Sequence, residues 1–358
     1  MQKQGVLIVN LGTPESPEIP HVKKYIKAFL SDNRVIRNQG PMWRILLNLI
    51  ILRKRAPKSA AKYRRIWTDQ GLPILVNAKA QKAHLQKLLP DAVVEYAMTY
   101  SEPSIHAAFD KLVKEGVTYI GLFPLFPQYS GTTVDSVFDA VINYGFAPCG
   151  STCKNKDCET HNVSVEAAGA ALRVKMLNLA GPDELIPLRL FTSFYKTPAY
   201  INFFADKIKN AAHDADGVLF SFHSIPEEYV LQDNDPYPQH CEETVKLIME
   251  AAGVDIPHFM GYQSKFGRTK WLEPNSHTLA NELPSKGIKR LLVLAPGFVS
   301  DNLETLVDID EEMRGSFLSS GGEKFTYLPT FNDDITLAHI IKDINKVLSE
   351  PMNKHVPK

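Results

Sequence analysis

The 358-residue sequence has few cysteines, no excess charge of either sign and no long apolar run. Four cysteines are too few for a disulfide-stapled scaffold. Forty basic and 40 acidic residues leave a net charge of zero, which gives no support to nucleic-acid binding. The apolar run at 45–52 is much shorter than the about 20 residues that cross a bilayer. The run at 5–9 is too short for a signal peptide, so we expect a cytoplasmic protein.

The chain length predicts two domains, and apolar patterns along the chain alternate between strands and helices. Strands are expected at 6–10, 93–98, 119–123, 188–191, 217–222, 258–261 and 290–294. Helices are expected at 78–89, 105–114, 199–211, 241–252 and 335–348. The alternation predicts an α/β fold of two similar Rossmann-like (flavodoxin-like) domains, each a parallel sheet flanked by helices.

A duplication supports two similar halves. Residues 5–15 and 217–227 align without a gap and share Gly, Val, Leu, Pro and Glu, five of eleven positions. Ligands of parallel sheets bind outside the carboxyl ends of the strands, so two facing halves predict an active-site cleft between them. The alignment places Leu11 opposite His223. The predicted N-terminal half covers residues 1–185 and contains an apolar segment at about 41–55 and a cysteine-containing insertion at about 146–185. The predicted C-terminal half covers residues 186–332 and is followed by a C-terminal helix and tail at 333–358.

Two groups of polar residues can carry chemistry. His223, at the end of a predicted strand, can act as a base or a metal ligand, or it can simply hydrogen-bond a loop. Asp301 can cap the helix that follows it. Capping does not explain Glu304 and Asp308, which lie four residues apart on one helix face. Carboxylates at this spacing repel one another unless a cation relieves them, so they predict a path for a metal ion.

Five ordered motifs around these residues resemble the ferrochelatase family. They are VNLGTPE at 9–15, SFHSIP at 221–226, DPYPQ at 235–239, YQSKFG at 262–267 with WLEP at 271–274, and PGFVSDNLETL at 296–306. The resemblance implies insertion of ferrous iron, as substrate, into a porphyrin during haem biosynthesis. Protoporphyrin IX is the expected porphyrin, and coproporphyrin, the substrate of some bacterial relatives, is the alternative.

The resemblance also assigns roles to residues. It makes His223 and Glu304 the catalytic pair that meets the iron, and it places Asp301 and Asp308 along the iron path. Asp308 is shorter than the Glu often found there, and Asn302 stands where many relatives have His. The implied porphyrin-binding residues are Leu11, Arg65, Gln128, Tyr129, Ser130, Gln263, Ser264, Trp271 and Phe298. Among them, Arg65 matches an arginine that faces porphyrin carboxylates.

The apolar segment at about 41–55 ends in Arg53, Lys54 and Arg55. It is either a buried helix with a solvated basic end or an interfacial lip that touches a membrane beside the porphyrin pocket. The resemblance favours the lip, since porphyrins partition into membranes. We therefore expect peripheral contact with the inner face of a membrane or with other haem-pathway enzymes.

Cys149, Cys153 and Cys158 are spaced C-x3-C-x4-C in a polar segment, which is typical of a metal or cluster loop. Some ferrochelatases carry a two-iron two-sulfur (2Fe-2S) cluster, and in one bacterial branch its ligands lie in an internal segment that this one resembles. A cluster needs four ligands, and Cys241 and His161 are the candidates for the fourth. Zinc and unligated thiols are the alternatives.

Two other functions remain open. A cobalt chelatase for a precorrin-type ring is disfavoured by the apolar segment, because its pocket accommodates more polar tetrapyrroles. A non-catalytic haem-binding or haem-delivery protein is disfavoured by the presence of both His223 and Glu304, since binding alone does not need the carboxylates.

Overall fold

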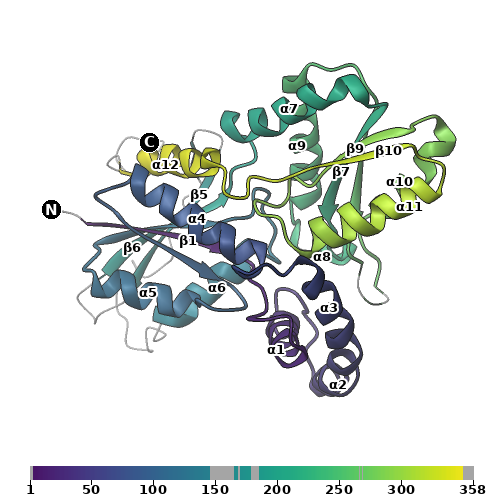
Figure 1. Cartoon of the computed structure of the whole chain (residues 1–358). Coiled ribbons are helices and arrows are strands. Elements are labelled where there is room, and N and C mark those ends of the chain that lie inside the picture. Colours follow the sequence, from purple (N-terminus) through teal and green to yellow (C-terminus); the bar gives the residue numbers. More distant parts are fainter. Residues whose placement is uncertain are drawn as a thin grey trace.

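The structure, a computed structural model, describes residues 3–145, 165–167, 170–178, 185–265, 267 and 269–349. It contains two β-sheets that lie next to each other, each covered by helices (Figure 1). The first sheet has the strand order β2-β1-β3-β6-β5-β4, and the second has the order β10-β9-β7-β8. The predicted α/β fold of two sheets flanked by helices is confirmed.

The first half of the chain alternates strands and helices after an initial helical excursion. Its strands are β1 (Gln4–Asn10), β2 (Val93–Met98), β3 (Tyr119–Pro124), β4 (Val165–Ala167), β5 (Ala170–Asn178) and β6 (Leu185–Ser193). Its helices are α1 (Ile19–Leu30), α2 (Pro41–Leu46), the π-helix η1 (Leu47–Ile51), α3 (Leu52–Ile66), α4 (Pro73–Leu88), α5 (Ile105–Lys114) and α6 (Val134–Gly145).

One edge of the first sheet is antiparallel. Strands β1, β2, β3 and β6 are parallel, whereas β5 is antiparallel to β6 and β4 is antiparallel to β5. The prediction of a wholly parallel first sheet is therefore wrong at this edge, within the segment predicted as an insertion. Only residues 179–184 join β5 to β6, and a parallel pair needs a crossover of a dozen or more residues.

The second half alternates strands and helices throughout. Its strands are β7 (Gly217–His223), β8 (His258–Gln263), β9 (Arg290–Leu294) and β10 (Lys324–Leu328). Its helices are α7 (Pro198–Ala211), the 3₁₀-helix η3 (Ala212–Asp214), α8 (Glu227–Asp233), α9 (Tyr237–Ala252), α10 (Ser276–Glu282), the 3₁₀-helix η4 (Leu283–Lys286), the π-helix η5 (Glu304–Met313), α11 (Arg314–Ser319) and α12 (Ile335–Ser349). Neighbouring strands of this sheet are parallel.

The two sheets repeat one strand order. The parallel part of the first sheet runs β2-β1-β3-β6, and the second sheet, taken from its other end, runs β8-β7-β9-β10. Strands β1 and β7, which align in sequence, therefore occupy equivalent central places. Nearly every residue in both is buried, as is typical of parallel strands covered on both faces. The repeated order supports the duplication.

An apolar core joins the two halves. It includes Val6 and Ile8 of β1 together with Val218 and Phe220 of β7, each at most 1% exposed. Helices α7 and α9 of the second half and α12 near the chain end contribute to the same core. Because this core is continuous, it fixes the position of the carboxyl ends of the strands in one sheet relative to those in the other.

The last helix returns to the first half. Helix α12 packs against α4, and the two lie side by side in Figure 1. The amides of Gln4 and Asn345 exchange hydrogen bonds of 2.7 and 3.0 Å. Strand β6 also belongs to the first sheet, since it pairs with β3. Both segments therefore contact elements of the N-terminal half, and α12 also packs against α7 of the second half.

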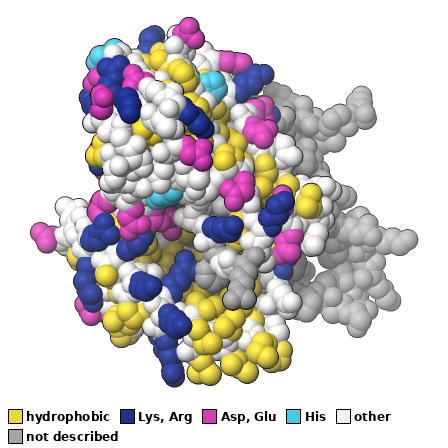
Figure 2. Space-filling model, turned by 90° about the vertical axis from the view of Figure 1, so that its right-hand side faces the viewer, with side chains coloured by type: hydrophobic (Ala, Val, Ile, Leu, Met, Phe, Trp, Pro, Cys, Tyr) yellow, Lys and Arg dark blue, Asp and Glu magenta, His cyan; other side chains and the backbone are white. Residues whose placement is uncertain are grey.

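Helices α1, α2, η1 and α3 form a projecting unit, which we call the helical arm, at the bottom of Figure 1. Leu47 and Leu52 are buried in its own small core. Large apolar side chains at its tip are exposed: Met42 by 76%, Ile45 by 55%, Leu46 by 38%, Leu49 by 53% and Ile50 by 48%. Figure 2 shows hydrophobic side chains gathered at this end, with Lys and Arg side chains above them.

The exposed tip contradicts the alternative of a buried helix for the segment at about 41–55, because most of its large apolar side chains lie outside the core. Among the described residues, no helix combines the length and apolar character needed to cross a membrane.

Candidate active site

Several predicted site residues lie at the carboxyl ends of parallel strands. His223 is the last residue of β7, and the register pairs it with Gln263, the last residue of β8. Leu11 directly follows β1. Phe298 follows β9 in a turn, where its backbone N–H donates to the carbonyl oxygen of Ala295. Figure 2 shows the surface hollowed between the upper and lower parts of the molecule, with acidic side chains and a histidine at the edge of the hollow.

His223 is held in one tautomer. Its Nδ1 lies 2.7 Å from the carbonyl oxygen of Ser224, which can only accept, so Nδ1 carries the proton and Nε2 carries the lone pair. The Tyr237 hydroxyl donates to the carbonyl oxygen of His223 at 2.9 Å and fixes its backbone. Burial lowers the pKa of His223 below its ordinary value. The imidazole is therefore neutral near pH 7 and can accept a proton or bind a metal.

Glu304, the first residue of η5, titrates near neutrality. Burial, as the larger cause, and the nearby carboxylate of Asp308 together raise its pKa to about 7. The charges of Arg55 and Asp308 act on the pKa of both Glu304 and His223, so the two groups share one electrostatic environment. A carboxyl group with this pKa can both accept and release a proton at physiological pH.

The π-helix aligns a row of carboxylates. Residues four apart lie on one face of a helix, and η5 continues without a break from Glu304 to Met313. Glu304, Asp308 and Glu312 have this spacing. Glu304 is partly buried, the Asp308 side chain is 23% exposed and that of Glu312 is 41% exposed. The row thus leads from the interior to the surface, and we call it the acidic row.

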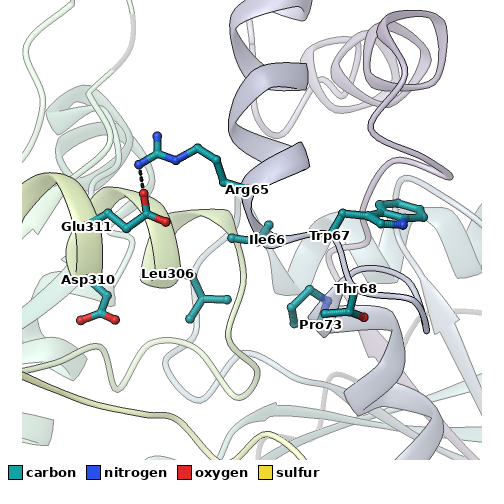
Figure 3. A pocket seen from close by; sticks show the side chains of 8 residues that line it. All are labelled: Arg65, Ile66, Trp67, Thr68, Pro73, Leu306, Asp310 and Glu311. Carbon is teal, nitrogen blue, oxygen red and sulfur yellow. Dashed lines mark ion pairs between the residues drawn. The ribbon is translucent and has the colours of Figure 1, made fainter.

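Basic residues of α3 cover the acidic row. The Lys62 ammonium lies 2.7 Å from Asp308 Oδ1 and 2.8 Å from Glu312 Oε1. Arg65 forms an ion pair with Glu311, drawn in Figure 3, and lies 3.6 Å from Glu312. In this structure Arg65 therefore contacts carboxylates of the protein itself, and its contact with porphyrin carboxylates stays a prediction.

Asp301 has buried partners of its own. Its carboxylate accepts hydrogen bonds of 2.6 Å from the Tyr327 hydroxyl and of 2.6 Å from the Asn332 amide. Only 6% of the residue is exposed. These contacts fasten the loop before η5 to the loop after β10. The place of Asp301 on an iron path stays a prediction.

The loop after β3 binds the second half. Buried Gln128 donates to the Thr244 hydroxyl at 2.9 Å, and the Ser130 hydroxyl donates to Asp235 at 2.9 Å. The backbone N–H of Tyr129 donates to His240 Nδ1 at 3.2 Å. These three predicted porphyrin-binding residues therefore hold the two halves together, and a direct role in binding stays a prediction for each.

Next to His223, several buried polar atoms have no hydrogen-bond partner within the described part of the chain. They are Nε2 of Gln263, Oγ of Ser264 and Nε1 of Trp271. The Gln263 carbonyl oxygen, in contrast, accepts from the Ser221 hydroxyl at 2.8 Å. Unsatisfied buried polar groups are costly and rare, so their concentration at predicted porphyrin-binding positions is typical of a site where a ligand or water completes the hydrogen bonds.

Some residues of the site were missed by sequence reasoning. Lys62 and Arg55 of α3 and Tyr25 of α1 lie around the acidic row, where burial and the Glu304 carboxylate raise the pKa of Tyr25. Tyr237, which fixes His223, belongs to a recognised motif but had no assigned role. The motif could have drawn attention to Tyr237, whereas no local signal identifies the helical-arm residues.

The cysteine segment lies largely outside the described residues, since Cys149, Cys153, Cys158 and His161 all belong to the undescribed range. Cys241 is on α9, fully buried in the shared core, and burial raises the pKa of its thiol. Across the described ranges, no group of three or more His, Cys, Asp or Glu side chains is arranged to hold a metal ion.

A cavity of about 340 Å³ lies between η5, the C-terminal end of α3 and the turn that leads to α4 (Figure 3). Its lining residues are Arg65, Ile66, Trp67, Thr68, Pro73, Leu306, Asp310 and Glu311. Neither His223 nor Glu304 belongs to this lining, whereas Arg65, a predicted porphyrin-binding residue, does.

Comparisons with known proteins identify the family of this chain. A family model described as Ferrochelatase matches residues 3–152 and 158–347. The coproporphyrin III ferrochelatase of Enterococcus faecalis (strain ATCC 700802 / V583) is 40% identical over 346 residues, 96% of this chain and 99% of that protein. The ferrochelatase of Actinobacillus pleuropneumoniae serotype 5b (strain L20) is 38% identical over 335 residues, 92% of this chain and 93% of that protein. The chain belongs to the ferrochelatase family.

Replacing Glu304 by Gln should stabilise the protein more at pH 8 than at pH 5. In the folded protein the pKa of Glu304 is about 7, above the ordinary value of 4.5 that applies to the unfolded chain. The free energy of unfolding therefore falls as the pH rises from below 4.5 through 7 and Glu304 loses its proton. Glutamine keeps the shape of the protonated form and cannot ionise. Thermal unfolding at both pH values measures the difference. The exposed carboxylate variant Glu323→Gln is the control, and an equal shift of Tm at both pH values would contradict a raised Glu304 pKa.

Proposed function

We propose that this ferrochelatase inserts ferrous iron into a porphyrin bound in the cleft beside His223 and Glu304. The observation that carries the proposal is the acidic row, which starts at a carboxyl group with a pKa of about 7 and continues to the surface. His223 shares the electrostatic environment of this row and is neutral near pH 7.

Metal insertion needs groups of this kind. The porphyrin must lose two pyrrole protons while Fe²⁺ sheds its water ligands. A neutral imidazole and a partly ionised carboxyl group can each accept a proton, and both can bind the iron transiently. Carboxylates such as Asp308 can carry a divalent cation along the row, because oxygen ligands replace part of its hydration shell. Asp301 serves as a further acidic group near the start of the row.

The walls of the cleft suit a flat, apolar ring with anionic substituents. Leu11, Trp271 and Phe298 supply apolar surface, and the unsatisfied polar atoms of Gln263 and Ser264 offer hydrogen bonds at its edge. Arg65 serves the porphyrin carboxylates in this proposal, which requires it to exchange its ion pair with Glu311 for one with the substrate. Gln128, Tyr129 and Ser130 act by keeping the two halves in register.

We propose a division into domains that follows the sheets. The N-terminal half extends to the end of β6 at Ser193 and not to residue 185, because β6 pairs with β3. Helix α12 is assigned to the N-terminal half, on which it packs.

The porphyrin is protoporphyrin IX in this proposal, since the exposed apolar tip of the helical arm suits a substrate that partitions into membranes. The name of the Enterococcus faecalis relative favours coproporphyrin III as the alternative. Comparison of kcat/KM for the two porphyrins with Fe²⁺ separates them, and a higher value for coproporphyrin III would assign the alternative.

His223→Ala should lower iron insertion at least about 100-fold, the usual contribution of a positioned proton acceptor. The variant should stay folded, because His223 ends a strand and is not fully buried. Loss of free-porphyrin fluorescence with Fe²⁺ under anaerobic conditions measures turnover. The control is His213→Ala, which removes an exposed histidine from η3. Near-normal turnover by His223→Ala would refute the site, and a wild type that binds haem but consumes no porphyrin would indicate a haem-binding protein.

The tip of the helical arm is proposed to dock on a membrane surface. Its exposed apolar side chains lie next to the exposed basic residues Arg44, Arg53 and Lys54. Apolar side chains that enter the interface, with cations that meet anionic headgroups, are the features of a peripheral membrane contact. Contact of the same tip with another haem-pathway enzyme is the alternative.

Replacing Ile45, Leu49 and Ile50 together by Ser should weaken binding to vesicles with anionic lipids at least about tenfold, because each large apolar side chain contributes on the order of 1 kcal/mol or more on leaving water. Vesicle co-sedimentation measures the binding.

The matched control replaces Leu318 and Ile335 by Ser, since these side chains are also exposed but lie on α11 and α12, outside the arm. Equal vesicle binding by the arm variant and the wild type would contradict a membrane contact and leave contact with a protein partner.

We also propose that the segment with Cys149, Cys153 and Cys158 holds a 2Fe-2S cluster. Among the described residues only Cys241 was a candidate ligand, and it does not fit, since its thiol is fully buried and its raised pKa disfavours the thiolate that binds iron. The proposal therefore assigns His161 as the fourth ligand. Histidine can replace cysteine at such clusters.

The purified protein should be reddish-brown, with visible absorption that persists without porphyrin. Cys153→Ser and His161→Ala should remove this absorption, whereas the control Cys241→Ser should retain it. Absorption spectra and iron and sulfide analysis measure the outcome. A colourless protein that contains zinc after anaerobic preparation would exclude the cluster, and loss of colour in Cys241→Ser alone would reverse the ligand assignment.

A further inference from the structure

Lys62 occupies the outer part of the acidic row. Its ammonium nitrogen lies 2.7 Å from Asp308 Oδ1, 2.8 Å from Glu312 Oε1 and 2.9 Å from Glu312 Oε2. One cation thus contacts the two carboxylates that lie between the surface and Glu304. A metal ion that enters along the row needs the same oxygen atoms.

The charges of the row are balanced by this contact. Three carboxylates on one helix face repel one another, and Lys62 offsets the outer two. Glu304 lies deeper and is relieved by its own protonation. Arg65, the other cation near the outer end, lies 3.6 Å from Glu312 but is paired chiefly with Glu311. Lys62 is therefore the cation positioned between Asp308 and Glu312.

The chemistry of lysine suits a temporary occupant. Its ammonium is a compact single charge on a flexible four-carbon stem, and the Lys62 side chain is 34% exposed, so the group can swing into solvent. A divalent ion brings twice the charge and gains more from the same two carboxylates. A monovalent ion brings no such advantage.

We propose that Lys62 is a displaceable counter-ion that holds the outer end of the acidic row until a divalent cation replaces it. This inference rests on the proposed function, since it assumes that the substrate iron enters along the row. Lys62 is a positioning residue: it sets the affinity of the outer carboxylates for metal and does not touch the porphyrin.

The packing of the helical arm determines where Lys62 lies. Lys62 lies on α3, the helix that begins beside the exposed tip, and α3 packs against η5. Tyr63 of α3 and Val307 of η5 belong to one apolar core. The packing of α3 on η5 thus sets where the Lys62 backbone lies relative to the row, while its side chain stays free to move.

The test compares Lys62→Met with the wild type. Removal of the ammonium leaves Asp308 and Glu312 without this counter-ion, so Mn²⁺, a divalent probe detected by electron paramagnetic resonance, should bind about three- to tenfold more tightly. In the iron insertion assay the apparent KM for Fe²⁺ should fall by more than kcat changes. Lys62→Arg keeps the charge and should bind Mn²⁺ no more tightly than the wild type.

Lys58→Met is the matched control, since Lys58 is an exposed lysine one turn earlier on α3. Unchanged Mn²⁺ affinity in Lys62→Met, or an equal gain in Lys58→Met, would overturn the inference. If Lys62→Met does not fold, judged by circular dichroism, Lys62→Gln provides the same comparison. The Lys62 result and the proposed function are tested separately. The proposed function is refuted if His223→Ala keeps its turnover, and this outcome does not depend on the Mn²⁺ affinity of the Lys62 variants.

Discussion

Glu304, Asp308 and Glu312 share one face of η5 because they are spaced four residues apart. Such a row repels itself, and two different means relieve it. Burial keeps Glu304 partly protonated, and the Lys62 ammonium pairs with the outer two. The chemistry proposed for the site depends on this balance, which a divalent cation can replace.

A second constraint is the fixed relation between the two halves. The shared core joins β1 to β7, and the loop after β3 inserts polar side chains into the second half. Ser130 and the Gly131 backbone both donate to the buried carboxylate of Asp235, at 2.9 and 2.8 Å. A buried carboxylate needs such donors, since it is costly to leave unpaired. The strand ends that carry Leu11 and His223 are thereby held for one ligand.

The helical arm is built differently from the rest of the chain. Its inner face forms a small core and packs on η5, while its tip exposes a contiguous group of apolar side chains. Hydrophobic patches that stay exposed are typical of interaction surfaces. Helix α3 therefore connects the exposed apolar tip, beside which it begins, with the outer end of the acidic row, which its Lys62 contacts.

The sequence by itself predicted the parallel strands except β10, helices α4, α5, α7, α9 and α12, and the place of His223 at a strand end, because these follow from local apolar patterns and short motifs. It also predicted Glu304 and Asp308 on one face, since four-residue spacing is a local property. Tertiary structure alone decided the antiparallel edge at β5, the return of α12 to the first half and the pairing of Lys62 with Asp308. That last pair is separated by 246 positions. Contacts at such separations depend on how helices pack, and packing is set by the summed burial of many side chains and leaves no local signal.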